Sequence, residues 1–178
     1  KSCIYLRDPV EELAEELLLL QWVKSRSHAT HKGVLPESFI ELMAVIEPDT
    51  MDSMGNLEKW LIGLSPRARR PLTDPVARLL TCMSPDDRPS PHVVSEALDT
   101  LAEFTAVGFR SDMPAFAAHL EAGLDLDIPP FAAATTAKRV ADLAAQLGKL
   151  EVVHRLLAVD REIYTTARRA FEVALETR

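Results

Sequence analysis

LAAQLGKLEVVHRLL, residues 143–157, is the stretch that decides the fold class of this 178-residue chain. Apolar residues recur at helical spacing both before and after Gly148. Glycine ends helices readily, because it adopts the left-handed backbone that is favoured just past the last turn. The stretch therefore predicts two antiparallel helices, 137–147 and 150–158, joined at Gly148, with Leu156 buried.

The same stretch resembles an ankyrin repeat. The residues that match the family's pattern of helix, turn and second helix are, in order, Leu143-Ala144-Ala145, Gly148, Val152-Val153 and Leu156-Leu157. An upstream copy begins at 111 and ends in Gly123-Leu124-Asp125-Leu126-Asp127. The family's Thr-Pro-Leu-His opening is absent, and the link after Asp127 is about four residues too long for the ~33-residue repeat. The resemblance covers roughly 111–178 and implies a solenoid of paired helices that binds protein partners.

Internal self-similarity supports this interpretation. Residues 135–144 read TTAKRVADLA, and residues 165–174, about one repeat period later, read TTARRAFEVA. Chance likeness between alanine-rich amphipathic helices is the alternative explanation.

Composition limits the function classes. The net charge of −7 argues against nucleic-acid binding. We find no apolar run of the ~18 residues that a membrane span needs. Cys3 and Cys82 are the two cysteines, so we expect an intracellular, cytoplasmic protein without a disulfide framework. Because the chain starts at Lys1 rather than methionine, we expect it to be part of a longer protein.

The expected fold is all-α: a helical N-terminal cap or subdomain (1–84), a proline-rich boundary loop (85–91), and ankyrin-like repeats forming an α-solenoid (92–178). Asp8-Pro9-Val10 and Asp74-Pro75-Val76 are strong helix starts, since aspartate caps and proline suits the first helical position. Residues 3–6 are a possible strand from a preceding domain. Asn56 is the expected cap of a short helix.

Few residues suggest chemistry. His28 and His31 have a spacing seen in metal sites, but their polar surroundings favour a solvated loop. Cys82 and His92 flank the proline-rich loop, and we interpret Cys82 as a buried thiol rather than a nucleophile. Arg67, Arg69 and Arg70 are expected in a basic loop, 65–72, which is either solvated or a docking motif. We therefore expect no catalytic residue, metal or cofactor.

A weaker likeness concerns 74–104. The run LLTCMSPDDRPS (79–90), followed by Val94 and Leu98, is similar to the end of a protein-kinase C-lobe. That resemblance implies a buried, ion-paired Arg88. The kinase catalytic Asp motif, Asp-Phe-Gly and Gly-rich loop are missing, so it also implies an inactive part of a larger enzyme.

Two groups of residues are candidates for partner binding. Pro129, Pro130 and Phe131 occupy the position of the family's hairpin finger, where stiff prolines and an aromatic anchor favour binding; the alternative is that Phe131 covers the core. Lys138-Arg139 and Arg168-Arg169 sit at matching places in the 30-residue similarity, in the first turn of successive helices. Cations there oppose the helix dipole. We expect them either to form a basic ladder for an acidic segment of a partner, or to pair with Asp142 and Glu172.

The sequence therefore favours a protein–protein interaction module of a larger intracellular protein. The alternative is a non-catalytic regulatory or C-lobe-like part of a larger, kinase-like enzyme, and a standalone helical enzyme is the third hypothesis. The expected partner is a protein, not nucleic acid or membrane. The sequence names neither the partner nor the oligomeric state.

Overall fold

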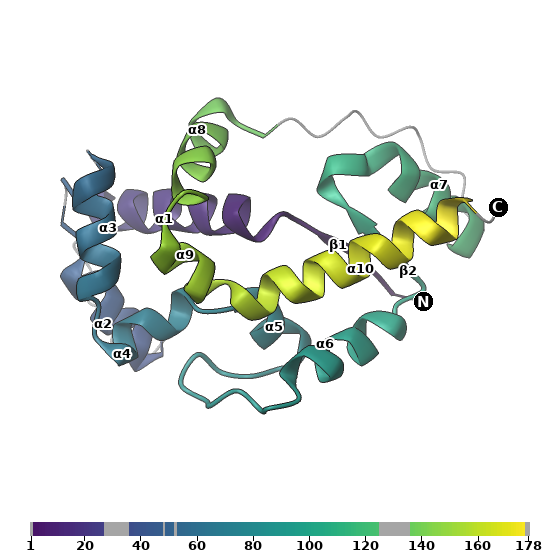
Figure 1. Cartoon of the computed structure of the whole chain (residues 1–178), viewed down its shortest axis with the longest axis horizontal. Helices are drawn as coiled ribbons and strands as arrows, with labels where there is room; N and C mark the ends of the chain where they lie inside the picture. The colour runs from purple at the N-terminus through teal and green to yellow at the C-terminus, as the bar shows by residue number, and fades with distance from the viewer. Residues whose placement is uncertain (1, 27–35, 48, 52, 125–135, 177–178) are drawn as a thin grey trace.

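The computed structural model describes residues 2–26, 36–47, 49–51, 53–124 and 136–176 (Figure 1). This part of the chain is mostly helical, which confirms the all-α class; the stacked solenoid is not confirmed. The elements in order are β1 (Cys3–Leu6), α1 (Pro9–Arg26), α2 (Glu37–Val45), α3 (Met54–Gly63), α4 (Pro66–Arg69), the 3-10 helix η1 (Arg70–Leu72), α5 (Pro75–Leu80), α6 (Val93–Ala102), β2 (Ala106–Phe109), the 3-10 helix η2 (Arg110–Asp112), α7 (Met113–Leu124), α8 (Lys138–Leu147), α9 (Glu151–Leu156) and α10 (Ala158–Glu176).

Strands β1 and β2 form a small parallel sheet, in register from Cys3↔Ala106 to Leu6↔Phe109. Residues 3–6 are thus a strand, but its partner lies within this chain and not in a preceding domain. Helix α7 packs against β2. A Cβ added at Gly108 would lie 2.1 Å from the Phe116 ring, so this close approach requires glycine.

Two large hydrophobic cores and one small cluster, Ala106, Phe116 and Leu120, hold the described part of the chain together. The first lies among α1, α2, α3, α8 and α9 and is built mainly from leucines. The second lies among β1, α5, α6, β2 and α10, where the Phe109 ring packs edge-on against Tyr164 and Phe171, each at 5.3 Å between centroids. Both cores contain residues from each side of 85–91. The two sides of the predicted boundary are therefore not separate packing units.

The turn at Gly148 separates α8 from α9, as the sequence predicts. Gly148 has φ −62° and ψ −10°, however, so the predicted left-handed cap is wrong. The chain instead turns through 3-10-type bonds, from Lys149 N–H to the Gln146 carbonyl at 3.1 Å and from Leu150 N–H to the Leu147 carbonyl at 2.9 Å. Helix α8 packs chiefly against α1, whereas α9 contacts α3 (Figure 1). Leu156 is buried in the first core, which confirms its predicted burial; the predicted place between successive repeats is not confirmed.

Local caps explain where several helices begin. Asp8 Oδ1 accepts hydrogen bonds from the N–H groups of Val10 (2.9 Å) and Glu11 (3.3 Å), as expected of a helix cap. The α3 cap is Ser53, whose Oγ accepts from Asn56 N–H at 3.1 Å. The expectation that Asn56 itself is the cap is therefore wrong.

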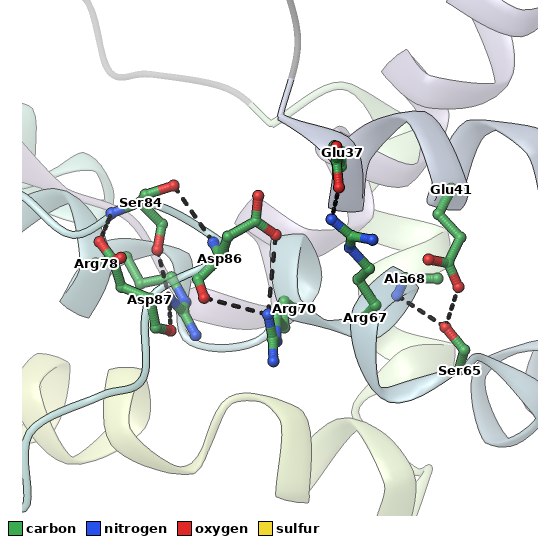
Figure 2. A network of polar contacts seen from close by, with 10 residues as sticks. All are labelled: Glu37, Glu41, Ser65, Arg67, Ala68, Arg70, Arg78, Ser84, Asp86 and Asp87. Atoms are coloured by element: carbon green, nitrogen blue, oxygen red, sulfur yellow. Dashed lines mark hydrogen bonds and ion pairs between the residues drawn. The ribbon is translucent and has the colours of Figure 1, made fainter.

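The arginine-rich segment 65–72 is helical rather than a loop. Ser65 caps α4 by accepting from Ala68 N–H at 3.0 Å, and Arg67 pairs with Glu37 on α2 (Figure 2). Arg69 donates to the carbonyls of Ile62 and Leu64 at the end of α3, while Arg70 donates to the Asp86 carbonyl. These three arginines join neighbouring elements, so the prediction of a solvated basic loop is wrong.

Candidate functional site

The structure describes four of the predicted partner-binding residues, Lys138 and Arg139 on α8 and Arg168 and Arg169 on α10. Pro129, Pro130 and Phe131 lie outside the described residues. Lys138 and Arg139 are in the first turn of α8, as predicted. There Lys138 pairs with Asp142 at 2.5 Å, and the Arg139 guanidinium donates to the Gln21 side chain at 3.3 Å.

Arg168 and Arg169 lie in the interior of α10, so their predicted place in a first turn is wrong. Arg168 Nε donates to Glu172 at 2.7 Å and one terminal nitrogen donates to Ser111 Oγ at 2.6 Å. Its guanidinium also lies 5.2 Å from the centre of the Phe109 ring. Arg168 is thus a half-buried packing residue, whereas Arg169 is exposed. The predicted alternative of pairing with acids four residues on describes both Lys138 and Arg168.

The residues considered for catalysis or metal binding lie only partly within the described residues. His28 and His31 lie outside the described residues. Cys82 is exposed and has φ +54°, which corrects the expectation of a buried thiol. Within the described ranges no group of three or more histidine, cysteine or acidic side chains is arranged to hold a metal. In the same ranges no helix is long and apolar enough to cross a membrane.

The arginine implied by the kinase likeness does not occupy a buried position. Arg88 is exposed, and the buried arginine of this region is Arg78 on α5. Arg78 donates to the carbonyls of Ser84 at 2.9 Å and Asp87 at 3.2 Å (Figure 2). It also donates to the Thr73 carbonyl at 3.1 Å. Burial lowers the pKa of this guanidinium. Arg78 therefore links the turn after α5 to the residues just before that helix by hydrogen bonds.

The most unusual polar site is a reciprocal pair of aspartates where the N-termini of α5 and α10 meet. Asp74 precedes α5, but its Oδ1 accepts from the N–H groups of Val159 (2.9 Å) and Asp160 (3.1 Å) on α10. Asp160 returns the interaction, since its two carboxyl oxygens accept from Val76 N–H (3.0 Å) and Ala77 N–H (2.7 Å) on α5. Each aspartate thus caps the other helix. We call this arrangement the crossed caps.

Burial controls the electrostatics of the crossed caps. Asp160 is 1% exposed and burial raises its pKa to about 7, although the two N–H donors act in the opposite direction. Burial also raises the pKa of Asp74. On the adjoining face of α1, burial raises the pKa of Glu16 to about 7, with further contributions from Glu12 and Asp160. Carboxyl groups in this junction hold their protons more tightly than they would in water.

An open apolar groove of about 400 Å³ runs between α6, β2, α7 and α10. Helix α10 contributes the small residues Ala167, Ala170 and Ala174 at helical spacing, and α6 and its exit contribute larger apolar side chains. Val173, on the same helix, is 54% exposed. The residues lining this α6–α10 groove are Leu98, Leu101, Ala102, Phe104, Thr105, Val107, His119, Thr166, Ala167, Ala170, Phe171 and Ala174.

Comparison with protein-family models, curated proteins and solved structures finds no match to this chain. The ankyrin and kinase C-lobe resemblances therefore stay predictions.

Sequence reasoning missed both the crossed caps and the α6–α10 groove. Asp160 has no predicted role in the sequence. The sequence did contain a signal for the crossed caps, because an aspartate in the first turn of a helix, such as Asp160, often accepts hydrogen bonds from free N–H groups. Alanines at 167, 170 and 174 mark one face of a helix, but spacing alone does not say that the face is open.

Proposed function

We propose that the chain is a non-catalytic protein-interaction module that binds an apolar helical segment of a partner protein in the α6–α10 groove. The single observation that supports this proposal is the groove itself, which is open and lined almost entirely by apolar side chains. Large contiguous apolar surface is uncommon on a protein that has no partner there.

The shape of the groove favours a helix as its occupant. Small side chains at Ala170 and Ala174 allow a second backbone to approach α10 closely, while Phe104 and Phe171 supply aromatic surface at the sides. Helical segments that dock in grooves present apolar anchors at spacings of three and four residues. The exposed Val173 and Leu175 extend the apolar surface toward the end of α10.

A peptide library tests the proposal. Helical peptides selected on the chain should be enriched in Leu, Phe or Met at positions i, i+3/i+4 and i+7. Ala170→Glu should weaken the selected peptides at least tenfold, because it places a charge in the apolar groove. Ala145→Glu is the matched control on the exposed side of α8, and it should leave the affinity unchanged.

Circular dichroism must show that both variants keep the helical content of the parent chain. Failure to enrich any apolar helical peptide would overturn the proposal. Equal weakening by Ala145→Glu and Ala170→Glu would also overturn it.

A further inference from the structure

A cleft of about 380 Å³ lies on another face, between α1 and α5, and combines apolar walls with acidic side chains. Leu19 on α1 is 54% exposed and Leu79 on α5 is 70% exposed, although both are large apolar residues that would normally be covered. Val76 and Pro75 add to the apolar lining. Glu12, Glu15 and Glu16 bring three carboxyl groups to the same cleft.

The charges in the cleft are not balanced. Arg7 is the cation of the lining, and it pairs with Glu12 at 3.4 Å and with Glu15. Arg110 approaches Glu15 from outside the cleft at 3.9 Å. In the described part of the chain, no lysine or arginine pairs with Glu16. This carboxyl group is half-buried, beside Glu12 and near Asp160, and has no counter-ion among the described residues.

We propose that the α1–α5 cleft is a second docking surface, which takes a basic amphipathic segment of a protein partner, with a lysine or arginine against Glu16 and apolar side chains against Leu19 and Leu79. This surface goes beyond the proposed function, because it is separate from the α6–α10 groove and recognises charge as well as apolar area.

Charge complementarity identifies this occupant. A cation of the partner would neutralise the one carboxyl group that the chain leaves unpaired there, at a site where reduced solvent strengthens the attraction. Lysine and arginine also carry an apolar stem that packs along leucine while the charged group reaches the acid. An acidic surface repels nucleic acid and anionic membranes, so a protein segment is the occupant that fits.

The probe is an array of fluorescein-labelled peptides that place one Lys or Arg between two Leu residues at spacings of three and four. The matched control array has Glu in place of each Lys or Arg. Fluorescence anisotropy with the full chain should show saturable binding for at least one basic peptide and none for its acidic counterpart. No basic peptide binding at 100 µM would overturn the proposal.

Variants then locate the peptide. Leu79→Ser and Glu16→Gln should each weaken the best peptide at least tenfold, whereas Glu121→Gln on the exposed side of α7 should have no effect. Leu79 is so exposed that its substitution should leave the thermal midpoint unchanged. Equal affinity of the parent chain and Leu79→Ser would place the peptide elsewhere and overturn the proposal.

A direct readout distinguishes an ion pair from simple apolar contact. The pKa of Glu16, followed by the NMR shift of its carboxyl carbon, is raised to about 7 in the free chain and should fall when the basic peptide binds. Ala170→Glu should leave this titration and the peptide affinity unchanged. A selective effect of Ala170→Glu would assign the peptide to the α6–α10 groove instead, so failure here and failure of the proposed function are distinguishable.

Discussion

Helices α1 and α5 begin with the same tripeptide, Asp8-Pro9-Val10 and Asp74-Pro75-Val76, yet the two aspartates act differently. Asp8 caps its own helix through bonds to Val10 and Glu11. Asp74 adopts φ +47°, and its side chain makes no bond to its own helix end but caps α10 instead. The difference teaches that a local cap motif fixes where a helix starts, whereas the packing of a second helix end decides which N–H groups the carboxylate reaches.

Removing the acceptor of the crossed caps at Asp160 should have the largest effect. Asp160→Ala leaves the N–H groups of Val76 and Ala77 without their acceptor in a buried site, so the free energy of unfolding should fall by about 2–5 kcal/mol. Urea unfolding at pH 6 measures this change. Asp160→Asn keeps one carbonyl acceptor and should cost less. A loss below about 1 kcal/mol for Asp160→Ala would show that other groups accept hydrogen bonds from the N–H groups at the start of α5.

Asp74 combines a cap with an unfavourable backbone conformation. Asp74→Ala loses the acceptor for Val159 and Asp160 and places alanine at positive φ, so it should cost about 2–4 kcal/mol. Asp74→Asn retains an acceptor and tolerates the left-handed region, and it should cost clearly less. Chemical denaturation of both variants tests this order. A reversed order would contradict the assigned role.

The pH dependence of stability should distinguish the buried junction from an ordinary surface cap. The folded pKa of Asp160, about 7, is above its ordinary value of 3.8, so the folded chain binds this proton more tightly than the unfolded chain. That stabilisation is complete below about pH 4 and is lost as the pH rises through about 7. Raising the pH from about 5 to 8 should therefore cost about 1–3 kcal/mol.

Asp160→Asn and Glu16→Gln isolate this effect from other titrating groups. Each should flatten the decline in stability, because each removes a carboxyl whose pKa is raised to about 7. Urea midpoints measured at intervals from pH 5 to 8 give the comparison. Curves parallel to that of the parent chain would contradict the assignment.

Removing the aspartate at the start of α1 should lower the free energy of unfolding less than removing the aspartate at the start of α5. Asp8 lies near the surface, so water can replace its bonds to α1, and Asp8→Ala should cost about 1 kcal/mol. Asp8→Ser keeps a cap and should be closer to neutral. Thermal and urea unfolding measure both. An effect as large as that of Asp74→Ala would remove the distinction between the two starts.

Gly148 should show the smallest effect. Its φ of −62° is open to any residue, and a Cβ there would lie 3.4 Å from the Ala144 carbonyl oxygen. Gly148→Ala should therefore change stability by within about 0.5 kcal/mol, or raise it slightly by restricting the unfolded chain. Gly108→Ala is the contrasting control, because its Cβ would overlap the Phe116 ring. Strong destabilisation by Gly148→Ala would contradict the right-handed turn.

Sequence reasoning located helices better than it located contacts. The apolar spacing around 143–157 predicted the helices now seen as α8 and α9, and Asp-Pro marked two helix starts correctly. The same reasoning placed Arg168 and Arg169 at a helix start, because the recurring Thr-Thr-Ala precedes α8. The second copy lies inside α10, where the helix begins earlier at Ala158. Similar local sequence does not specify the same position in a helix.

Burial was predicted less well than helix position, because an apolar helical spacing fits a buried side chain and an exposed one equally. Cys82 and Leu79 follow an apolar helical spacing, yet both are exposed. Cys82 lies beyond the end of α5 at Leu80, whereas Leu79 lies within α5 on a side that no other described element covers. Leu156 follows the same kind of spacing and is buried, because α9 packs against α3 in the first core. Spacing defines an apolar face, but only a neighbouring element buries it.

The sequence by itself determined the helical class, the break near Gly148 and the helix starts at Asp8 and Asp74, since spacing, caps and proline act over a few residues. The tertiary structure alone decided the parallel pairing of β1 with β2, the crossed caps, the α6–α10 groove and the α1–α5 cleft. Each of these features joins segments far apart in the chain: Asp160 reaches Ala77, and Leu6 pairs with Phe109. Such contacts depend on how whole helices pack, because that packing sets which free N–H groups, carboxyl groups and apolar faces meet.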